Sequence, residues 1–263
     1  MTPAKKVADY FEAPVKQLLT LTSRSHRPWP VPRRPWVMGQ TWHSLLFAHW
    51  RIAPDRLRPR VPAGLAIDTH DGAAWLGITP FYLSGLRVSV APPVPLLSTF
   101  PELNLRTYVT VDGKRGIFFF SLDAASRVAV ATARRFYWLP YFNARMAFGR
   151  EGTDVYVESE RDDPRGHDAG FVARYRPTGR AETAPPGTLE HFLTERYCLY
   201  TVDGAGTLYR AEIHHPPWPL QPADAEIAVN TMPAPGLALP TEPPLLHFSA
   251  RQDVLIWPPD RLR

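Results

Sequence analysis

Proline is the residue that most limits what this chain can fold into. The 263-residue sequence contains 30 prolines, which is about twice the share of roughly 5% usual in globular proteins. They gather in clusters such as PWPVPRRPW, APPVP and HHPPWPLQP. Because proline lacks a backbone N–H and its ring clashes with the preceding helical turn, long helices are excluded at these places.

Glycine-containing turns between apolar runs indicate what takes the place of helices. Asp71-Gly72 and Asp112-Gly113 each lie between two apolar-rich runs, which is a strong signal of a β-hairpin. The segments RMAFGREGTDVYVESER and CLYTVDGAGTLYRAEI repeat the pattern with longer turns. At least four hairpins in one chain predict a mainly β (α+β) protein with an antiparallel barrel or sandwich. Helical spacing predicts two interrupting helices, near residues 125–137 and 189–197.

The N-terminal segment has a different pattern from the rest of the chain. Residues 3–21 place apolar side chains at helical spacing, although Pro14 is expected to kink or divide them. The stretch Arg27–Pro35 is rich in proline and arginine and is typical of an extended linker. We therefore expect an N-terminal helical appendage and linker over residues 1–35, followed by a single β-barrel domain over residues 36–263.

Charge and cysteine content indicate the partners and the compartment. The formal charge is +5, yet most basic residues alternate with acids and no block of like charges stands out, which favours a solvated surface over a nucleic-acid footprint. Cys198 is the single cysteine, so no intrachain disulfide forms and a reducing compartment is favoured. No apolar run reaches the length of a membrane span. The prediction is a cytoplasmic protein that binds neither nucleic acid nor membrane.

The common metal and cofactor motifs are missing from the sequence. His43 and His49 lie six residues apart on the expected first strand, about 20 Å at strand spacing, too far to share a metal ion. There is no H-E-x-x-H, C-x-x-C, G-x-G-x-x-G, P-loop or G-x-S-x-G pattern. We therefore predict no metal and no cofactor.

The hairpin around Asp112-Gly113 carries the candidate site, because its two faces differ in chemistry. One face is expected to be apolar and to contain Leu103, Leu105, Thr107 and Val109. The other is expected to pair Glu102 with Asp123, Asn104 with Ser121, Arg106 with Phe119, and Tyr108 with Ile117. Two opposed carboxylates repel unless an arginine or a cation lies between them or one keeps its proton. Such a pair is a functional candidate.

A plainer interpretation of the same face is the solvent side of an edge hairpin, where charged residues need no functional explanation. Periodicity alone favours this alternative. Glu102 and Arg106 are about 13 Å apart along the strand, so they could bracket a ligand but are not expected to pair.

Several segments, taken in order, resemble the YqjF-like uncharacterised bacterial family of the acetoacetate decarboxylase-like superfamily. They are FAHWRIAPDRLRPRVPAGLAIDTHDGAAWLGITPF, FPELNLRTYV, FFFSLDA, LPYF, TLEHFLTERYCLY and HHPPWPL. The resemblance covers roughly residues 40–222 and leaves out about the first thirty. It implies an antiparallel, cone-like double β-barrel whose interior cavity binds a small molecule.

The resemblance also implies a test of the chemistry. Acetoacetate decarboxylase forms a Schiff base through a lysine that follows a proline, and the depressed pKa of that lysine makes it reactive. Here Tyr141 follows Pro140 in the corresponding stretch, RRFYWLPYF. Of the four lysines, three precede the domain and one lies in a hairpin turn, namely Lys5, Lys6, Lys16 and Lys114. Schiff-base decarboxylation is therefore disfavoured.

The leading hypothesis is a small-molecule-binding barrel for a weak acid or for an aromatic or apolar metabolite. The residues predicted around its cavity are Glu102, Asn104, Arg106, Ser121, Asp123 and Tyr141, with Arg106 holding an anionic group. In the enzyme alternative, lyase or hydrolase-like, Glu102 or Asp123 acts as a non-covalent general acid or base on a small carbonyl or carboxylate substrate. A third class is nucleic-acid or partner binding through the basic Arg27–Arg34 arm. Whether the chain forms a homo-oligomer is open at this point.

Overall fold

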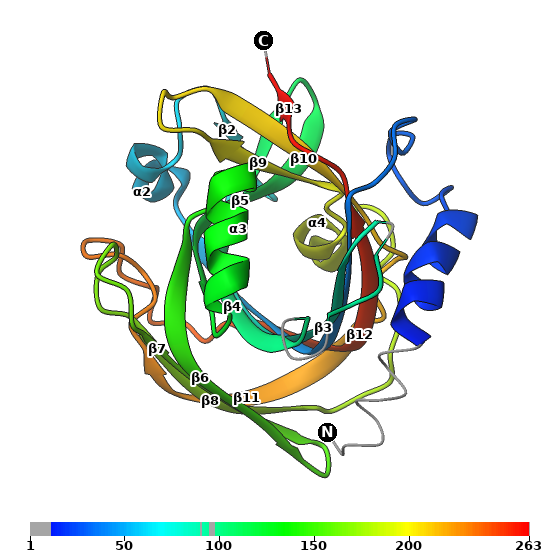
Figure 1. The fold of residues 1–263 in the computed structure, drawn as a ribbon. Helices are drawn as coiled ribbons and strands as arrows, with labels where there is room; N and C mark the ends of the chain where they lie inside the picture. Colours follow the sequence, from blue (N-terminus) through cyan, green and yellow to red (C-terminus); the bar gives the residue numbers. More distant parts are fainter. Residues whose placement is uncertain (1–11, 90, 95–97, 263) are drawn as a thin grey trace.

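Strands are the predominant secondary structure of the chain (Figure 1). The computed structural model describes residues 12–89, 91–94 and 98–262. The strands are β1 Met38–Ile52, β2 Ala66–Ile67, β3 Ala74–Val88, β4 Phe100–Val111, β5 Lys114–Ala124, β6 Tyr141–Glu151, β7 Asp154–Arg161, β8 Gly170–Pro177, β9 Cys198–Val202, β10 Leu208–His214, β11 Gln221–Asn230, β12 Leu245–Ile256 and β13 Asp260–Arg261. The helical elements are residues 12–19, η1 Thr20–Thr22, α2 Pro54–Leu57, η2 Arg58–Arg60, α3 Arg127–Tyr137 and α4 Leu189–Thr194. The predicted mainly β class is confirmed.

The strands form one hydrogen-bonded sheet in the order β13-β10-β9-β5-β6-β7-β8-β11-β12-β1-β3-β4-β2. Two additional pairings, β5 with β4 and β10 with β12, join strands that are far apart in that order. The sheet is therefore strongly curved, and Figure 1 shows its strands following one another around the molecule. Strand β1 bends where its register shifts after His43, next to Ser44 with a φ of 50°. The finer expectation of a cone-like double barrel stays a prediction.

Three of the four predicted hairpins form as expected from their turn residues. Asp112 and Gly113 connect β4 to β5 and have φ values of 49° and 74°. Aspartate and glycine both tolerate this left-handed backbone conformation. The pairs β6–β7 and β9–β10 form the next two hairpins. Around Asp71-Gly72 the turn forms with a single bridge, His70 to Ala73, but β2 pairs with β4 instead of β3. The prediction of a full hairpin there was wrong.

The helices lie where the sequence predicts them, but their ends differ from the predicted ones. Helix α3 begins after Ser126, whose Oγ accepts from the Ala129 N–H as an N-cap, and it ends at Trp138 in the left-handed conformation. Helix α4 stops at Thr194, three residues before the expected end. Residues 12–19 form one helix that includes Pro14, so the expected break at Pro14 does not occur in the described part.

A bulge in β5 overturns part of the predicted pairing with β4. Arg106 lies opposite Phe119 as expected, but Leu105 lies opposite Ser121, so Phe120 has no partner. Every residue of β5 after Phe120 is shifted by one, and a one-residue shift reverses the faces of a strand. As a result Asp123 lies opposite Leu103, and the predicted pairing of Glu102 with Asp123 and of Asn104 with Ser121 was wrong.

The strands β1, β3 and β4 are buried on both faces. One face contributes to the largest core cluster, which also contains residues of β7 and β8; members are Leu46, Ala48, Leu76, Ile78, Leu103, Leu105, Val155, Val157, Phe171 and Tyr175. The β7–β8 side of the sheet therefore folds over these strands as a second layer. The opposite face of β1 and β3 contributes Phe47 and Phe81 to a separate cluster with Trp218. Polar side chains on that opposite face are enclosed as well.

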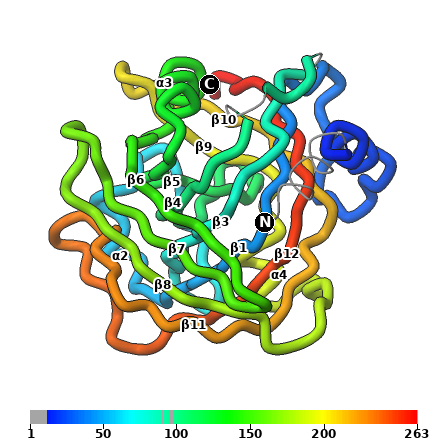
Figure 2. Tube along the Cα trace, turned by 60° about the horizontal axis from the view of Figure 1, so that its bottom comes forward, coloured from blue at the N-terminus to red at the C-terminus, as the bar shows by residue number. Residues whose placement is uncertain are grey.

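The N-terminal segment packs on the outside of the sheet, beside β1 and β12 in both views (Figures 1 and 2). Gln17 is fully buried there and donates to the carbonyl of Gly85 over 3.0 Å. Arg27 pairs with Glu212 at 3.0 Å, and Arg34 pairs with Asp260 at 2.6 Å. Two arginines of the basic arm are thus bound to carboxylates of the chain itself. The domain boundary at residue 35 stays a prediction.

Candidate functional site

Three polar side chains of β4 alternate along the face that points away from the largest core cluster, which we call the site face. Glu102, Asn104 and Arg106 are 4%, 5% and 6% exposed. The other face of the strand carries Leu103 and Leu105 of the largest cluster. The alternative that Glu102 and Arg106 lie on the solvent side of an edge hairpin is therefore wrong.

Strands β3 and β1 extend the site face sideways as three rows. Read from β4 to β3, the rows are Arg106–Gly77, Asn104–Thr79 and Glu102–Phe81. Successive rows are two residues apart, which is about 7 Å in a strand. Gly77 pairs in turn with His49 of β1. A Cβ atom at Gly77 would lie 3.0 Å from the His49 ring and 3.3 Å from Arg106 Cγ, so glycine lets these two side chains approach each other.

Arg106 is a buried cation without a carboxylate partner among the described residues. Its guanidinium carbon lies 5.3 Å from the centre of the Phe47 ring and 5.8 Å from that of Tyr108, and its Nε–H has no acceptor. Three other buried arginines form ion pairs: Arg27 with Glu212, Arg161 with Asp123 and Arg196 with Asp68. A fourth, Arg87, donates to Gln17 and to two backbone carbonyls. Because an unpaired buried charge is costly, Arg106 is the residue on this face that most needs an anion.

His49 lies next to Arg106 and is neutral. Its Nε2 is 2.6 Å from the hydroxyl of Tyr108, and its Nδ1 has no partner within the described chain. Burial, followed by the positive charge of Arg106, lowers the pKa of His49 well below its usual value. His49 therefore adds no positive charge to that of Arg106 at this end of the site face. The sequence gives His49 no role at this site: it excludes a metal ion shared with His43, and no local pattern connects His49 to β4.

The middle row presents two polar atoms that the described residues leave without partners. They are Asn104 Oδ1 and Thr79 Oγ1, on side chains that are 5% and 1% exposed. Buried polar atoms are usually hydrogen-bonded, to protein or to water. Because these two atoms lie between the Arg106 row and the Glu102 row, the middle row can bind a polar group of a ligand or an ordered water.

Glu102 forms the other end of the site face together with Tyr141. The Tyr141 hydroxyl donates to Glu102 Oε2 over 3.0 Å. Burial raises the pKa of Glu102 to about 8, although the hydrogen bond from Tyr141 acts in the opposite direction. At neutral pH this carboxyl group is mostly protonated, so it can donate a hydrogen bond or a proton. Burial, and then the neighbouring Glu102, raises the pKa of Tyr141 well above its usual value.

The position of Tyr141 is set by α3 and by the start of β6. Arg134 of α3 donates to the Tyr141 carbonyl over 2.8 Å, and Tyr141 pairs with Leu122 of β5. Leu122 is itself the partner of Asn104, so the backbone of Tyr141 lies level with the middle row. Its side chain extends to the next row, where the hydroxyl contacts Glu102. Tyr141 and Glu102, both among the six residues predicted around one cavity, are in contact in the structure.

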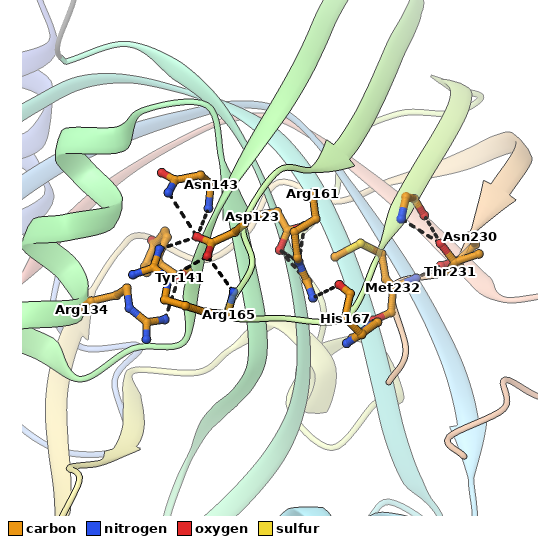
Figure 3. Close-up of polar contacts among 12 residues, drawn as sticks. Asp123, Arg134, Tyr141, Asn143, Arg161, Arg165, His167, Asn230, Thr231 and Met232 are labelled. Atoms are coloured by element: carbon orange, nitrogen blue, oxygen red, sulfur yellow. Dashed lines mark hydrogen bonds and ion pairs between the residues drawn. The ribbon is translucent and has the colours of Figure 1, made fainter. Parts of the chain in front are cut away.

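Ser121 and Asp123 lie on the opposite face of β5 because of the bulge. Asp123 is fully buried and pairs with Arg161 of β7 at 2.7 Å. Arg161 also donates to the His167 carbonyl, and Figure 3 shows it between Asp123 and His167. Burial raises the pKa of Asp123, although Arg161 acts in the opposite direction. The structure therefore brings together Glu102, Asn104, Arg106 and Tyr141, but not these two residues.

Neither described lysine lies at the site face. The Lys114 ammonium is 4.0 Å from Glu212 and 5.4 Å from the centre of the Trp29 ring, at the β4–β5 turn. Lys16 pairs with Glu12 on the exposed N-terminal helix. Lys5 and Lys6 lie outside the described residues. The residue after Pro140, where the resemblance places a reactive amine, is Tyr141.

A concave region lies away from the site face. It is a hollow of about 550 Å³ across β6, β7, β8 and β11, lined in part by Ala147, Tyr156, Val172, Arg174 and Glu226. None of the predicted site residues lines it. Within residues 12–89, 91–94 and 98–262, no three His, Cys, Asp or Glu side chains gather as a metal-binding group. No helix in that same part of the chain is both long and apolar enough to span a membrane.

Solved structures with the same fold include enzymes. The enduracididine biosynthesis enzyme MppR, complexed with pyruvate, is 12% identical and has a TM-score of 0.63, over 88% of this chain and 92% of the other. An acetoacetate decarboxylase structure is 13% identical with a TM-score of 0.61, over 92% of this chain and 96% of the other. At these identities the likeness concerns the fold alone.

A much closer sequence relative is the Uncharacterized protein YqjF of Bacillus subtilis (strain 168). It is 49% identical over 230 residues, which cover 87% of this chain and 93% of the relative. Residues 39–253 match DUF2071, a family described as an uncharacterized conserved protein. The chain belongs to this DUF2071 family, and its fold is that of the acetoacetate decarboxylase-like proteins.

Proposed function

We propose that the chain binds a small carboxylate at Arg106, inside a closed, cone-like double β-barrel. The observation that carries this proposal is the burial of Arg106 on the site face. Arg106 is 6% exposed, and its guanidinium has no carboxylate partner among the described residues. Bound carboxylate would accept charge-assisted hydrogen bonds from the planar guanidinium fork, for which arginine is well suited. The neutral His49 would leave this charge uncompensated until the ligand arrives.

The apolar surroundings of Arg106 support a ligand with an organic body. Phe47 packs edge-on against Trp218, with ring centres 4.9 Å apart, and both belong to the cluster on this side of β1. A ligand whose carboxylate bonds to Arg106 would place its next atoms near these rings. The pyruvate complex of MppR, which has the same fold, is a further reason to test keto acids.

The test compares carboxylates with their neutral amides in a thermal-shift assay. Benzoate and pyruvate are expected to raise the unfolding temperature increasingly as their concentrations exceed the dissociation constant, whereas benzamide and pyruvamide leave it unchanged. Arg106→Gln should abolish the shift, while Arg176→Gln, an exposed arginine on β8, should keep it. Carboxylate binding that survives Arg106→Gln would refute the proposal.

A second candidate function is supported by Glu102 and Tyr141. A carboxyl group with a pKa of about 8 can exchange a proton with a carbon acid near neutral pH, which is the requirement for general acid–base catalysis. In this enzyme the keto acid stays non-covalently bound, because the proline-linked amine of the decarboxylases is replaced by Tyr141.

Deuterium exchange measured by NMR tests the second candidate. Hydrogens next to the ketone of a keto acid should exchange with D2O faster in the presence of the protein, and Glu102→Gln should remove the effect. Borohydride should trap no covalent adduct. Unchanged exchange for all keto acids that bind at Arg106 would leave binding as the function and reject catalysis.

We also propose a cytoplasmic location. Cys198 is buried, and burial raises the pKa of its thiol to about 12, so it is poorly suited to disulfide exchange. Cell fractionation tests this directly, and recovery of the protein in an extracytoplasmic fraction would contradict it.

A further inference from the structure

We infer that the ligand is an elongated monocarboxylic acid, with a neutral carbonyl or hydroxyl oxygen about 7 Å from its carboxylate, lying along β4 from Arg106 to Glu102. This inference rests on the proposed anion site at Arg106 and adds the length and the end group of the ligand.

The length follows from the two ends of the site face. Arg106 and Glu102 lie four residues apart on one strand and point to the same side, so their Cα atoms are about 13 Å apart. Tyr108, which lies beyond Arg106, has its ring 5.8 Å from the guanidinium, and Tyr141 holds Glu102 at the opposite end. After one hydrogen bond at each end, about 7 Å remains for the ligand. A three-carbon acid such as pyruvate is too short to reach both.

The end group follows from the chemistry of Glu102. One carboxyl oxygen accepts from the Tyr141 hydroxyl, so a proton on the group is free to point from the other oxygen toward a ligand. Burial, which keeps Glu102 protonated at neutral pH, makes that end a donor to a neutral oxygen. A second carboxylate there would compete with Glu102 for one proton and would be disfavoured. The site therefore distinguishes keto acids from dicarboxylic acids of equal length.

The middle of the site face accommodates the connecting atoms of the ligand. Asn104 Oδ1 and Thr79 Oγ1 offer hydrogen bonds to a hydroxyl substituent or to a bridging water. On the flank, Trp42 packs against Phe81 with ring centres 5.4 Å apart and stacks on Trp218 at 6.0 Å. These rings offer apolar surface to a hydrocarbon or aryl body.

Isothermal titration calorimetry with three acids tests the inference on the full-length chain. The probes are 5-oxohexanoate, which has the inferred length and a neutral end; glutarate, which has nearly the same length and two charges; and pyruvate, which is short. We expect 5-oxohexanoate to bind at least ~10-fold more tightly than either of the others, the equivalent of one good hydrogen bond.

Variants of Glu102 separate the two ends of the site. Glu102→Gln keeps a donor, so it should retain 5-oxohexanoate binding and gain affinity for glutarate. Glu102→Met removes the donor at similar volume and should reduce 5-oxohexanoate binding about tenfold without changing pyruvate binding. Glu160→Met, on the exposed part of β7, serves as the matched control. Circular dichroism and the urea midpoint confirm that each variant is folded.

The outcomes separate this inference from the proposed function. Arg106-dependent binding of pyruvate that equals or exceeds that of 5-oxohexanoate would overturn the inference and leave the anion site standing. Equal binding of glutarate and 5-oxohexanoate would overturn the end-group argument in the same way. If no acid binds, or if binding survives Arg106→Gln, the inference and the proposed function both fail.

Discussion

The carboxyl group of Glu102 is buried away from water. No cation of the described residues lies within salt-bridge distance of it. Its burial favours the neutral form, so the folded protein holds a proton that the unfolded chain releases at lower pH. Folding and proton binding are therefore linked at this residue, and the linkage can be measured whether or not a ligand is known.

The linkage predicts how Glu102→Gln changes the pH dependence of stability. Because the folded pKa of about 8 is raised above the ordinary 4.5, the unfolded state binds fewer protons between these values, so wild-type stability falls as pH rises through this window. The fall in the free energy of unfolding is about 1.4 kcal/mol for each pH unit that separates the folded and unfolded pKa. Urea denaturation from pH 4 to 9 should show the variant gaining on wild type up to about pH 8 and then no further.

Glu160→Gln, at an exposed position, is the control and should follow the wild-type pH profile. A constant difference between Glu102→Gln and wild type across the range would mean that Glu102 ionises normally in the folded protein.

Gly77 is the second residue whose role can be isolated. Its substitution by alanine would place a methyl group against His49 and Arg106 at 3.0–3.3 Å, so both side chains would have to shift. We expect a loss of about 1–3 kcal/mol in the free energy of unfolding, together with weaker carboxylate binding. Gly149→Ala on β6, where nothing lies within 4 Å of the new methyl group, should be near neutral. Equal effects of the two substitutions would show that close packing at Gly77 is unimportant.

At the scale of elements, the sequence predicted local features and missed the ones that depend on distant strands. The Asp112-Gly113 turn and the Ser126 cap of α3 are specified by neighbouring residues, and both form. The bulge at Phe120 is not, because the apolar sequence FFF fits either face of β5. The site face of β4 was identified by alternation, while its burial depends on strands that only the folded chain brings together.

The ion pair between Asp123 and Arg161 joins β5 to β7, two strands that are not neighbours in the sheet. Arg161→Met would leave Asp123 buried without its partner, and we expect a loss of about 3–5 kcal/mol in the free energy of unfolding. Arg145→Met removes an exposed pair with Glu160 and should cost at most about 1 kcal/mol. Urea denaturation measures both. If the two variants lose the same stability, the buried pair does not hold these strands together.

At the scale of the whole molecule, the N-terminal segment is fastened to the sheet by buried polar contacts. Arg27 and the Trp29 indole both donate to Glu212, over 3.0 and 2.7 Å, and the His214 ring lies 2.8 Å from the carbonyl of Thr20. Composition predicted an extended linker over Arg27–Pro35, but arginine and proline content does not reveal which of its side chains bind buried acids.

Arg27→Met is expected to loosen this segment without unfolding the sheet. The loss of charged hydrogen bonds should cost about 1.5–3 kcal/mol locally, so trypsin should cleave after Arg24 and Arg33 several times faster. Arg176→Met, at an exposed pair on β8, should leave the cleavage rate unchanged. If the rate of cleavage equals the rate of global unfolding, the N-terminal segment does not detach from the sheet while the rest of the protein stays folded.

The unpaired position of Phe120 has a consequence for how chains of this kind can change in length. A β5 that lacked Phe120 would still place Asp123 opposite Leu103, so the acid would stay with Arg161. A β5 that lacked Leu122 would turn the same acid toward Asn104, between Arg106 and Glu102. Deletion of Phe120 would therefore leave the charge of the site unchanged. Deletion of Leu122 would place the Asp123 carboxylate next to Arg106, where it would occupy the proposed anion site.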